Sequence, residues 1–319
     1  MVSTKPKVVD AFARGPRFDV RQMRAFLCVA EELHFGRAAA RLFTSQPALS
    51  RTVHALEQVV GTPLLERSTR RVRLTAAGEA FAAECRIALM HLDRAAGAAV
   101  DAAEGRAGRL RLAYNDFAIN GRLPTLLRDF RQRYPRNQLD LEYMPSSKQR
   151  HALLEGRIDI GFMIGEFEST RVLNVLVDQD DFVALLPDGH PLAARRTLRL
   201  TDLANEPFVL GTEDAFSSFR RLVYPLCHEA GFMPDVVQQA SNTSGIFGMV
   251  AAGVGVSLFA GCARNLKRAG VVVKALDDVA EVIPLFAAWP AEDGSEVLRR
   301  FTEFLVANAQ LGVRAKAKR

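Results

Sequence analysis

The sequence predicts an α/β protein of several units: a small basic module of helices and a hairpin, one long helix, and a larger domain with two lobes. Three observations predict this organisation. The chain has 319 residues, which is too long for one ordinary domain. Apolar residues recur at helical spacing in the first third, and short apolar strands alternate with helices after it. Positive charge gathers at one end, since 13 Lys and Arg face 6 Asp and Glu up to residue 74, whereas 29 face 30 in the remainder.

The composition excludes several classes of protein. Hydrophobic residues make up 49% and charged residues 24% of the chain, which is the balance of a folded rather than a disordered protein. No stretch reaches the roughly 18 to 20 uncharged apolar residues of a membrane span. The N-terminus also lacks the apolar segment of a secretory signal. We therefore expect a cytoplasmic protein without a membrane partner.

The cysteines and histidines do not form a metal-binding pattern. The four cysteines, Cys28, Cys85, Cys227 and Cys262, contain no C-x-x-C pair, and none of the six histidines pair at ligand spacing. We expect buried, reduced thiols, no metal and no cofactor.

The N-terminal module is predicted over residues 19–75, after a mobile tail over residues 1–18. An apolar stripe predicts a first helix over about 20–33, and a short second helix runs from Gly36 to Phe43. Ser45 is a good N-cap for a third helix, with Pro47 in its first turn, and Gly61 ends that helix.

The outer face of the third helix and the hairpin after it predict a DNA-binding surface. The hairpin alternates apolar and basic residues, so the whole set describes a winged helix-turn-helix. A solvated basic face with no ligand is the alternative on charge alone. The residues that we expect at bases or phosphates are Gln46, Pro47, Ser50, Arg51, His54, Arg37, Arg41, Arg67, Arg71 and Arg73.

Residues 76–104 predict a long linker helix. The run contains no proline, is rich in alanine and follows Thr75, a capping residue. Apolar residues alternate steps of four and three, which predicts a coiled-coil dimer, although a lone helix packed on its own domain is the alternative. The predicted dimer-interface residues are Phe81, Cys85, Ala88, Leu92, Ala95 and Ala99.

Residues 105–319 predict a two-lobed domain, with lobe I at about 107–178 and 281–310 and lobe II at about 179–280. Strands are expected at 109–114, 139–144, 158–164, 181–186, 236–239, 255–260 and 283–289. Helices are expected at about 123–134, 148–154, 243–252 and 296–309. Chain crossings between the lobes would leave a cleft.

Polar residues at the ends of these strands predict a ligand site in the cleft. Free N–H groups and hydroxyls at helix N-termini suit a carboxylate. Ser146 and Ser147 have helix capping as an alternative role, and the phenylalanines have core packing as theirs. Asp116 would repel an acid unless Lys148, Arg122 or protonation offsets its charge, which favours a mixed-polarity ligand. The expected binding residues are Asn115, Asp116, Phe117, Ser146, Ser147, Phe162, Thr212, Phe216, Asn242 and Thr243.

No catalytic constellation is present in the sequence. There is no G-x-S-x-G, H-E-x-x-H or P-loop, and Gly253-Val-Gly255 lacks the third glycine of a dinucleotide fingerprint. His228 and Cys227 are adjacent on a helix and point apart. The sequence thus predicts no enzyme.

The run from Phe18 to Phe81 resembles the DNA-binding region of LysR-type transcriptional regulators. The segments RAAARLFTSQPALSR, LE-x-x-x-G-x-x-LLER and RVRLTAAG carry the resemblance, and HALLEGRIDIGF and MVAAGVGVSLFA extend it loosely along the chain. Gly36 departs from the family, which usually has a Ser or Thr cap there. The resemblance implies a periplasmic-binding-protein-like effector domain, and Ser146 corresponds to a hydroxyl contact in regulators of aromatic-acid degradation.

These observations predict a transcriptional regulator that binds promoter DNA as a homodimer or homotetramer. Its expected effector is a small organic or aromatic acid, and RNA polymerase is a further candidate partner. The alternative is a cytosolic two-lobed solute-binding protein or small-molecule enzyme, whose basic N-terminus serves only for assembly.

Overall fold

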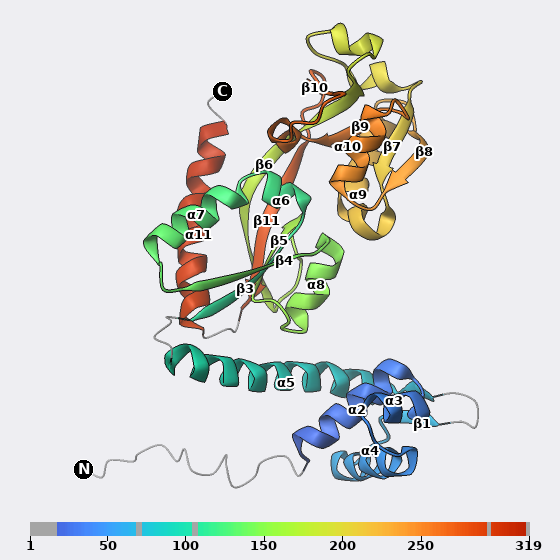
Figure 1. Ribbon diagram of the computed structural model, residues 1–319, viewed down its shortest axis with the longest axis vertical. Helices are drawn as coiled ribbons and strands as arrows, with labels where there is room; N and C mark the ends of the chain where they lie inside the picture. Colours follow the sequence, from blue (N-terminus) through green and yellow to red (C-terminus); the bar gives the residue numbers. More distant parts are fainter. Residues whose placement is uncertain (1–17, 68–71, 104–107, 292–294, 317–319) are drawn as a thin grey trace. The chain divides into compact units, whose positions relative to one another are not determined.

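The structure is a computed structural model that describes residues 18–67, 72–103, 108–291 and 295–316 (Figure 1). The chain divides into two compact units, Met1–Ala96 and Gly97–Arg319. The predicted tail over residues 1–18 lies outside the described residues except for Phe18. Among the described helices, none is both long and apolar enough to cross a membrane.

The N-terminal unit has the predicted three helices and hairpin. They are α2 (Val20–Glu32), α3 (Phe35–Arg41), α4 (Gln46–Val60), β1 (Leu65–Arg67) and β2 (Val72–Leu74), with the two strands antiparallel. The three helices pack around a core that includes Phe26, Val29, Val53 and Leu56, each fully buried. Glu57 joins α4 to the hairpin, because its Oε1 accepts from the backbone N–H groups of Leu64 and Leu65.

The helix caps confirm two predictions and correct one. Ser45 Oγ accepts from Ala48 N at 3.3 Å, and Gly61 closes α4 in the left-handed conformation with φ +83°. Gly36, in contrast, is not the cap of the second helix. His34 caps α3, since its Nδ1 accepts from the backbone N–H groups of Gly36 and Arg37. An imidazole nitrogen thus does what a Ser or Thr hydroxyl does elsewhere.

The long helix α5 (Ala76–Ala103) begins at Thr75, as predicted. Thr75 Oγ1 accepts from Gly78 N at 2.9 Å. Gly78 is required here, because a Cβ at this position would lie 2.0 Å from the carbonyl oxygen of Leu64. The first turns of α5 therefore pack closely against the hairpin.

Lobe I of the second unit is built on a mixed sheet. Its strands are β3 (Arg109–Tyr114), β4 (Gln138–Tyr143), β5 (Ile160–Ile164), β11 (Val282–Pro290) and the first part of β6 (Val172–Pro187). Their order is β6-β11-β5-β3-β4, with β3 parallel to β4 and β5 and with β11 antiparallel to its neighbours. The repeated parallel β–helix–β units were predicted from the alternation of strands and helices.

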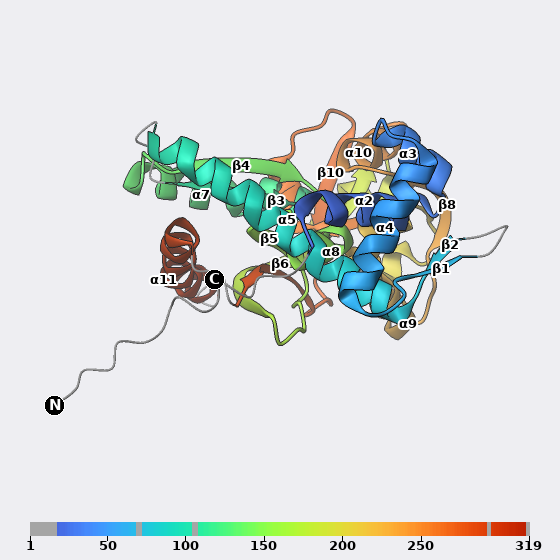
Figure 2. The same cartoon turned by 90° about the horizontal axis from the view of Figure 1, so that it is seen from below.

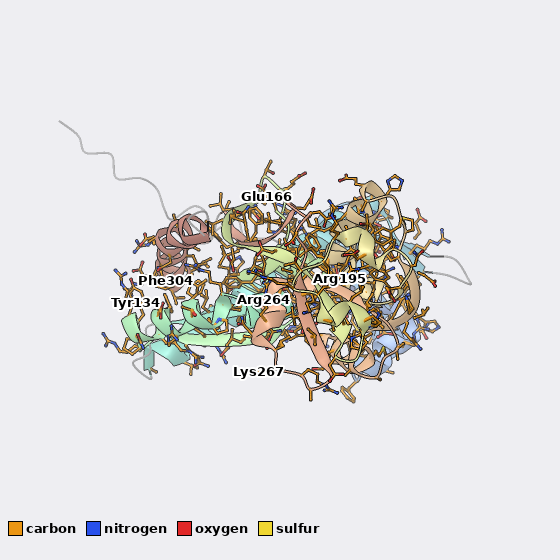
Figure 3. All side chains as sticks on the ribbon, turned by 90° about the horizontal axis from the view of Figure 1, so that it is seen from above. Tyr134, Glu166, Arg195, Arg264, Lys267 and Phe304 are labelled. Carbon is orange, nitrogen blue, oxygen red and sulfur yellow. The ribbon has the colours of Figure 1, made fainter. Side chains whose placement is uncertain are left out.

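Helices cover both faces of this sheet. Figures 1 and 2 show α7 (Leu123–Arg133) and α11 (Glu296–Lys316) on one face and α8 (Ser146–Leu154) on the other. Phe130 of α7 packs against Tyr134, Phe301 and Phe304 at centroid distances of 4.8, 4.7 and 5.5 Å. Figure 3 shows Tyr134 and Phe304 at the same end of the lobe.

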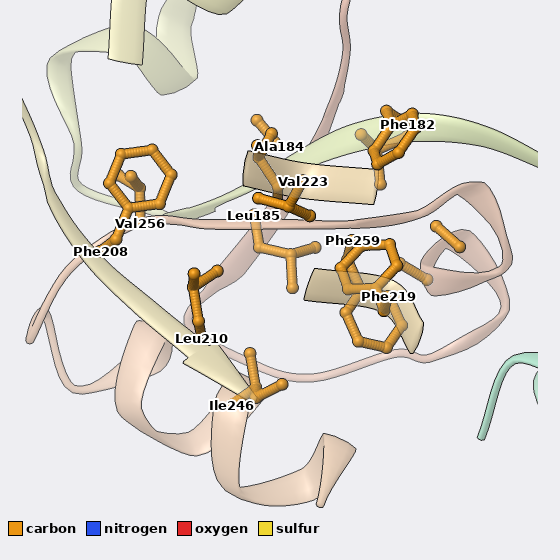
Figure 4. Close-up of a cluster of buried hydrophobic side chains, with 14 of the residues drawn as sticks. Phe182, Ala184, Leu185, Phe208, Leu210, Phe219, Val223, Ile246, Val256 and Phe259 are labelled. Carbon is orange, nitrogen blue, oxygen red and sulfur yellow. The ribbon is translucent and has the colours of Figure 1, made fainter. Parts of the chain in front are cut away.

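Lobe II packs around a second core. It contains the end of β6, which pairs with β9 (Ser257–Ala260) and β10 (Val271–Ala275), and a parallel pair, β7 (Pro207–Gly211) and β8 (Asp235–Ala240). Its helices are α9 (Glu213–Glu229) and α10 (Thr243–Ala251), with short 3-10 turns at Pro191–Ala194, Leu200–Leu203 and Gly261–Asn265. Figure 4 shows Phe208, Phe219, Ile246 and Phe259 within this core.

The strand β6 runs through both lobes. The sequence predicted a strand only from Asp181, but the strand begins at Val172 and pairs with β11 before it reaches β9 and β10. Its first half contains polar residues such as Asn174, Asp178 and Gln179, so it does not show the apolar run from which a strand is predicted. One continuous strand therefore joins the two halves of the domain.

Candidate functional site

The outer face of α4 carries the predicted base-reading residues. Gln46, Pro47, Arg51 and His54 are exposed, and Ser50 is half-buried. The opposite face of the helix is buried in the core. In the described part of the chain, Arg51 forms no ion pair with a carboxylate, so its guanidinium is available to an external acceptor.

Two predicted phosphate contacts are instead held by acidic residues of the same unit. Arg41 Nη1 lies 2.8 Å from Glu31 Oε2 and 3.2 Å from Glu32 Oε1. The hydrogen bonds that Arg41 donates to Glu31 and Glu32 raise the pKa of Arg41. Arg37 Nε lies 3.2 Å from Glu32 Oε2, and Arg37 also donates to the carbonyl oxygen of Glu32. A phosphate would have to compete with these carboxylates.

The wing offers a second basic surface. Arg73 is exposed on β2, where it lies directly opposite Glu66 of β1 in the strand register. Arg67 closes β1, but its side chain and the whole of Arg71 lie outside the described residues.

The predicted dimer seam divides into a buried and an exposed part. Cys85 is 3% exposed, and Phe81 packs against Phe18 and Phe26 with both ring centroids at 5.5 Å. Cys85 therefore belongs to the core of its own unit and has almost no accessible surface with which to contact a second chain. The exposed members of the seam are Ala88, Leu92, Ala95 and Ala99.

A cavity between the lobes contains half of the predicted effector-binding residues. Lobe I contributes the ends of β3, β4 and β5, and lobe II contributes the first turns of α9. The space is about 10 Å³, enough for one water molecule. The lining residues are Asn115, Asp116, Phe117, Tyr143, Ser146, Ile164, Ala215, Phe216, Ser218 and Phe219.

Ser146 lies at the centre of the polar contacts of this cavity. Its Oγ accepts from Asn115 Nδ2 at 2.9 Å and from the backbone N–H of Ile164 at 3.1 Å. The amide of Asn115 is fixed, because its Oδ1 accepts from Ala118 N. Ser146 is therefore not a helix cap, which was its alternative role, and Pro145 holds the cap position of α8.

The hydroxyl proton of Ser146 is left for another acceptor. A serine hydroxyl can accept two hydrogen bonds and donate one. Both acceptor positions of Ser146 are used, and no described residue accepts its O–H. The side chain is only 5% exposed, so the donor lies in a largely desolvated place.

Asp116 lines the cavity, but its partner is not one of those that the sequence suggested. Tyr143 donates its O–H to Asp116 Oδ2 at 2.7 Å. Burial and this hydrogen bond raise the pKa of the Tyr143 phenol, so it remains a neutral donor. Lys148 pairs with Asp214 instead, and Arg122 donates to the carbonyl oxygen of Asn308.

Five predicted effector-binding residues lie outside this cavity. Phe162 is fully buried two residues before the end of β5, where its ring centroid lies 6.5 Å from that of Phe301 of α11. Thr212 and Asn242 precede α9 and α10, and Asn242 caps α10 by accepting from Gly245 N. Ser147 is half-buried beside the cavity residue Ser146. Thr243 is buried, and its Oγ1 has no hydrogen-bond partner in the described part of the chain.

The sequence missed five residues that line the cavity: Tyr143, Ile164, Ala215, Ser218 and Phe219. Tyr143 and Ile164 end β4 and β5, so the rule that ligands bind at the carboxyl ends of strands could have found them. Ala215, Ser218 and Phe219 belong to α9, which has a non-helical residue at Phe216 (φ −123°, ψ 18°). No sequence signal marked that kink.

The thiols do not form a reactive site. All four cysteines are buried and unpaired, as the sequence predicted. Burial raises the pKa of Cys85 to about 11 and that of Cys227 to about 12, which is opposite to the shift of a nucleophilic cysteine. Within the described residues, no group of three or more His, Cys, Asp or Glu could hold a metal ion.

Comparison with known proteins assigns both units to one family. The model of the bacterial regulatory helix-turn-helix protein, lysR family, matches residues 20–79. The LysR substrate binding domain matches residues 103–310. The transcriptional regulator AlsR of Bacillus subtilis (strain 168) is 32% identical over 283 residues, covering 89% of this chain and 94% of AlsR.

Solved structures give the same assignment. CbnR, a LysR family transcriptional regulator, matches with a TM-score of 0.69 at 27% identity, covering 92% of this chain and 99% of CbnR. Full-length CbnR complexed with its target DNA matches with a TM-score of 0.68 at 27% identity, covering 91% and 100%. The solute-binding or enzymatic alternative is therefore wrong. The chain belongs to the LysR family of bacterial transcriptional regulators, and it is a DNA-binding regulator with an effector-binding domain rather than an enzyme.

Proposed function

We propose that this regulator acts in the cytoplasm and reads its operator with the outer face of α4. Arg51 is the principal base-reading residue, because it is exposed, carries no ion pair in the described part of the chain, and has the guanidinium fork that fits guanine. Gln46, Pro47, Ser50 and His54 complete the surface. Arg73, Arg67 and Arg71 of the wing hold phosphates, while Arg37 and Arg41 contribute less because Glu31 and Glu32 already neutralise them.

Each function is assigned to one segment of the chain. Residues 19–75 bind DNA, residues 76–104 link and dimerise, and residues 105–319 bind the effector. A dimer joined along the exposed residues of α5, from Ala88 to Ala99, presents two copies of α4 to successive major grooves. Pairs of dimers would give a tetramer, and RNA polymerase is the expected partner at a promoter.

The effector is an organic acid that accepts a hydrogen bond from the hydroxyl group of Ser146. The single observation that carries this proposal is the Ser146 Oγ, whose two acceptor positions are filled and whose donor is unused among the described residues. A carboxylate oxygen is a strong acceptor for such a desolvated O–H. The N-terminus of α8 adds to the attraction for a negative group.

Asp116 sets the polarity at another part of the same cavity. Its carboxylate repels a second acid group but accepts a hydroxyl or an amine, as it already accepts the phenol of Tyr143. Phe117, Phe216 and Phe219 add apolar walls. The expected effector is thus a mixed-polarity molecule, such as a hydroxylated aromatic acid. Because the cavity holds only about one water molecule, the lobes or Phe216 must move to admit it.

The test is the thermal stability of the full-length protein in the presence of benzoate and its hydroxylated derivatives. Wild-type protein is expected to gain several degrees with a hydroxylated acid and less with a dicarboxylate of similar size. Ser146→Ala should lose the gain, and Asp116→Asn should lose the preference for the hydroxyl group. An equal response of all three proteins to every acid would overturn the assignment of this cavity.

A further inference from the structure

Two arginines from different lobes lie beside the cavity. Arg150 belongs to α8 of lobe I and Arg221 to α9 of lobe II, and these two helices are in contact. Lys148 Nζ and Asp214 Oδ2, 3.0 Å apart, bridge the same two helices. The arginine pair therefore lies at a boundary between the lobes.

Arg150 stacks on an aromatic ring, but it makes only two long hydrogen bonds. Its guanidinium carbon lies 5.1 Å from the centroid of the Phe167 ring, a stacking distance. Its Nη2 lies 3.5 Å from the carbonyl oxygen of Ile164 and 3.4 Å from that of Gly165, both long for a hydrogen bond. Most of its five donors remain available.

Arg221 is tied to the cavity through a serine. Its Nη2 donates to Ser218 Oγ at 3.2 Å, and Ser218 lines the cavity. Ile164, whose carbonyl lies near Arg150, lines the same cavity. Both guanidinium groups thus lie one residue away from the effector space, on opposite sides of the lobe boundary.

Neither arginine is neutralised by a carboxylate in the described part of the chain. Nearby basic residues do form ion pairs: Lys148 pairs with Asp214, and Arg220 pairs with Glu213. Burial and the charge of Arg221 lower the pKa of Arg150, and Glu168 opposes this effect more weakly. Two like charges that approach across a boundary disfavour the closed arrangement of the lobes.

We propose that Arg150 and Arg221 form a site for a doubly charged oxyanion, which bridges the lobes and stabilises their closed arrangement. The guanidinium fork matches the oxygens of a carboxylate or a phosphate, and an anion between two such forks replaces repulsion with attraction. This site is separate from the Ser146 donor. Its ligand closes the lobes whether or not an acid occupies the cavity, so the two ligands would bind cooperatively.

The test uses the full-length protein and two probes, inorganic phosphate and malonate. The unfolding temperature is followed as each probe is added, with sodium chloride keeping the ionic strength constant. Arg150→Gln and Arg221→Gln should each weaken the apparent affinity at least tenfold. Arg196→Gln, at an exposed arginine elsewhere in lobe II, is the matched control and should respond as wild type does. Any phosphate binding at the DNA-binding unit is common to all these variants and cancels in the comparison.

A second readout separates ligand binding from a structural role. Without either probe, Arg221→Gln should unfold no earlier than Arg196→Gln, because it removes a repulsion. A loss of stability in that condition, or equal responses of all variants to both probes, would overturn the proposal. A response to one probe alone supports the site and identifies its preferred group. Ser146→Ala should keep the response to phosphate, so failure of the effector assignment would leave this site standing.

Discussion

Ser146 Oγ lies 2.9 Å from Asn115 Nδ2, and this contact joins the segments that follow β3 and β4 at the cavity between the lobes. Asn115 in turn caps α6 (Asp116–Asn120) through its Oδ1. One serine thus positions an amide, a short helix and the end of β5, and it still has a proton to donate. Ser146 therefore both supports the fold around the cavity and offers a hydrogen-bond donor to a ligand.

Substitution of Ser146 should therefore affect stability as well as effector binding. Ser146→Ala leaves two buried N–H groups, those of Asn115 Nδ2 and Ile164, without an acceptor. Unsatisfied buried donors cost about 1–3 kcal/mol, so the free energy of unfolding should fall by that amount in a urea titration. Ser147→Ala, at the half-buried neighbour, is the control and should change it by less than about 0.5 kcal/mol. Equal stability of the two variants would show that the contact does not form.

Arg51 and Arg41 should contribute unequally to DNA binding. Arg51→Ala is expected to lose about 1–3 kcal/mol of binding to the operator and to relax the sequence preference. Arg41→Ala should lose less, because Arg41 already pairs with Glu31 and Glu32. Fluorescence anisotropy with operator and shuffled DNA measures both effects. A larger loss for Arg41→Ala would mean that its ion pairs break on DNA and that α3 makes the stronger contact.

The exposed part of α5 should hold the dimer together. Leu92 is 49% exposed, and Leu92→Glu places a charge in the predicted seam. Sedimentation at micromolar concentration should show a shift of this variant toward the monomer. Ala83→Glu, also exposed on α5 but outside the seam, should remain assembled. Dissociation of both variants, or of neither, would place the interface elsewhere.

The position of the Phe216 ring should depend on the absence of a side chain at Gly211. A Cβ at position 211 would lie 2.1 Å from Phe216 Cγ, so Gly211→Ala must displace a ring that lines the cavity. The expected loss of stability is about 1–3 kcal/mol, with altered acid binding. Gly189→Ala meets nothing within 4 Å and is the matched control. Calorimetry that finds both variants as stable as wild type would show that Phe216 has room to move.

The N-terminal unit was predictable because its signals are local. Ser45, Gly61 and Thr75 act on the backbone within a few residues, and each lies where the sequence predicted it. The exception is His34, which caps α3 through an imidazole nitrogen. Capping rules favour hydroxyl and carboxylate side chains, so the sequence pointed to Gly36 instead.

The cavity was only half predictable because its second wall comes from far along the chain. Asn115, Asp116 and Ser146 follow strands, where a general rule applies. The side of the sheet on which Phe162 lies could not be predicted, because every residue of β5 is buried and a strand buried on both sides gives no alternation that distinguishes its faces. Ser218 and Phe219 follow the non-helical residue Phe216 in α9, whose side chain occupies the space that a Cβ at Gly211 would take, and no local sequence pattern marks this approach.

The most direct test of the regulator is binding of the purified full-length protein to its own upstream DNA, against a shuffled sequence, across a salt series. Preferential binding to the upstream DNA is expected, with an affinity that falls steeply as salt increases, because Lys and Arg displace the counterions condensed on the DNA phosphates. Arg51→Ala is expected to remove the preference. Salt-sensitive binding that is equal on both DNAs would contradict the account, because it would reduce the outer face of α4 to an electrostatic patch.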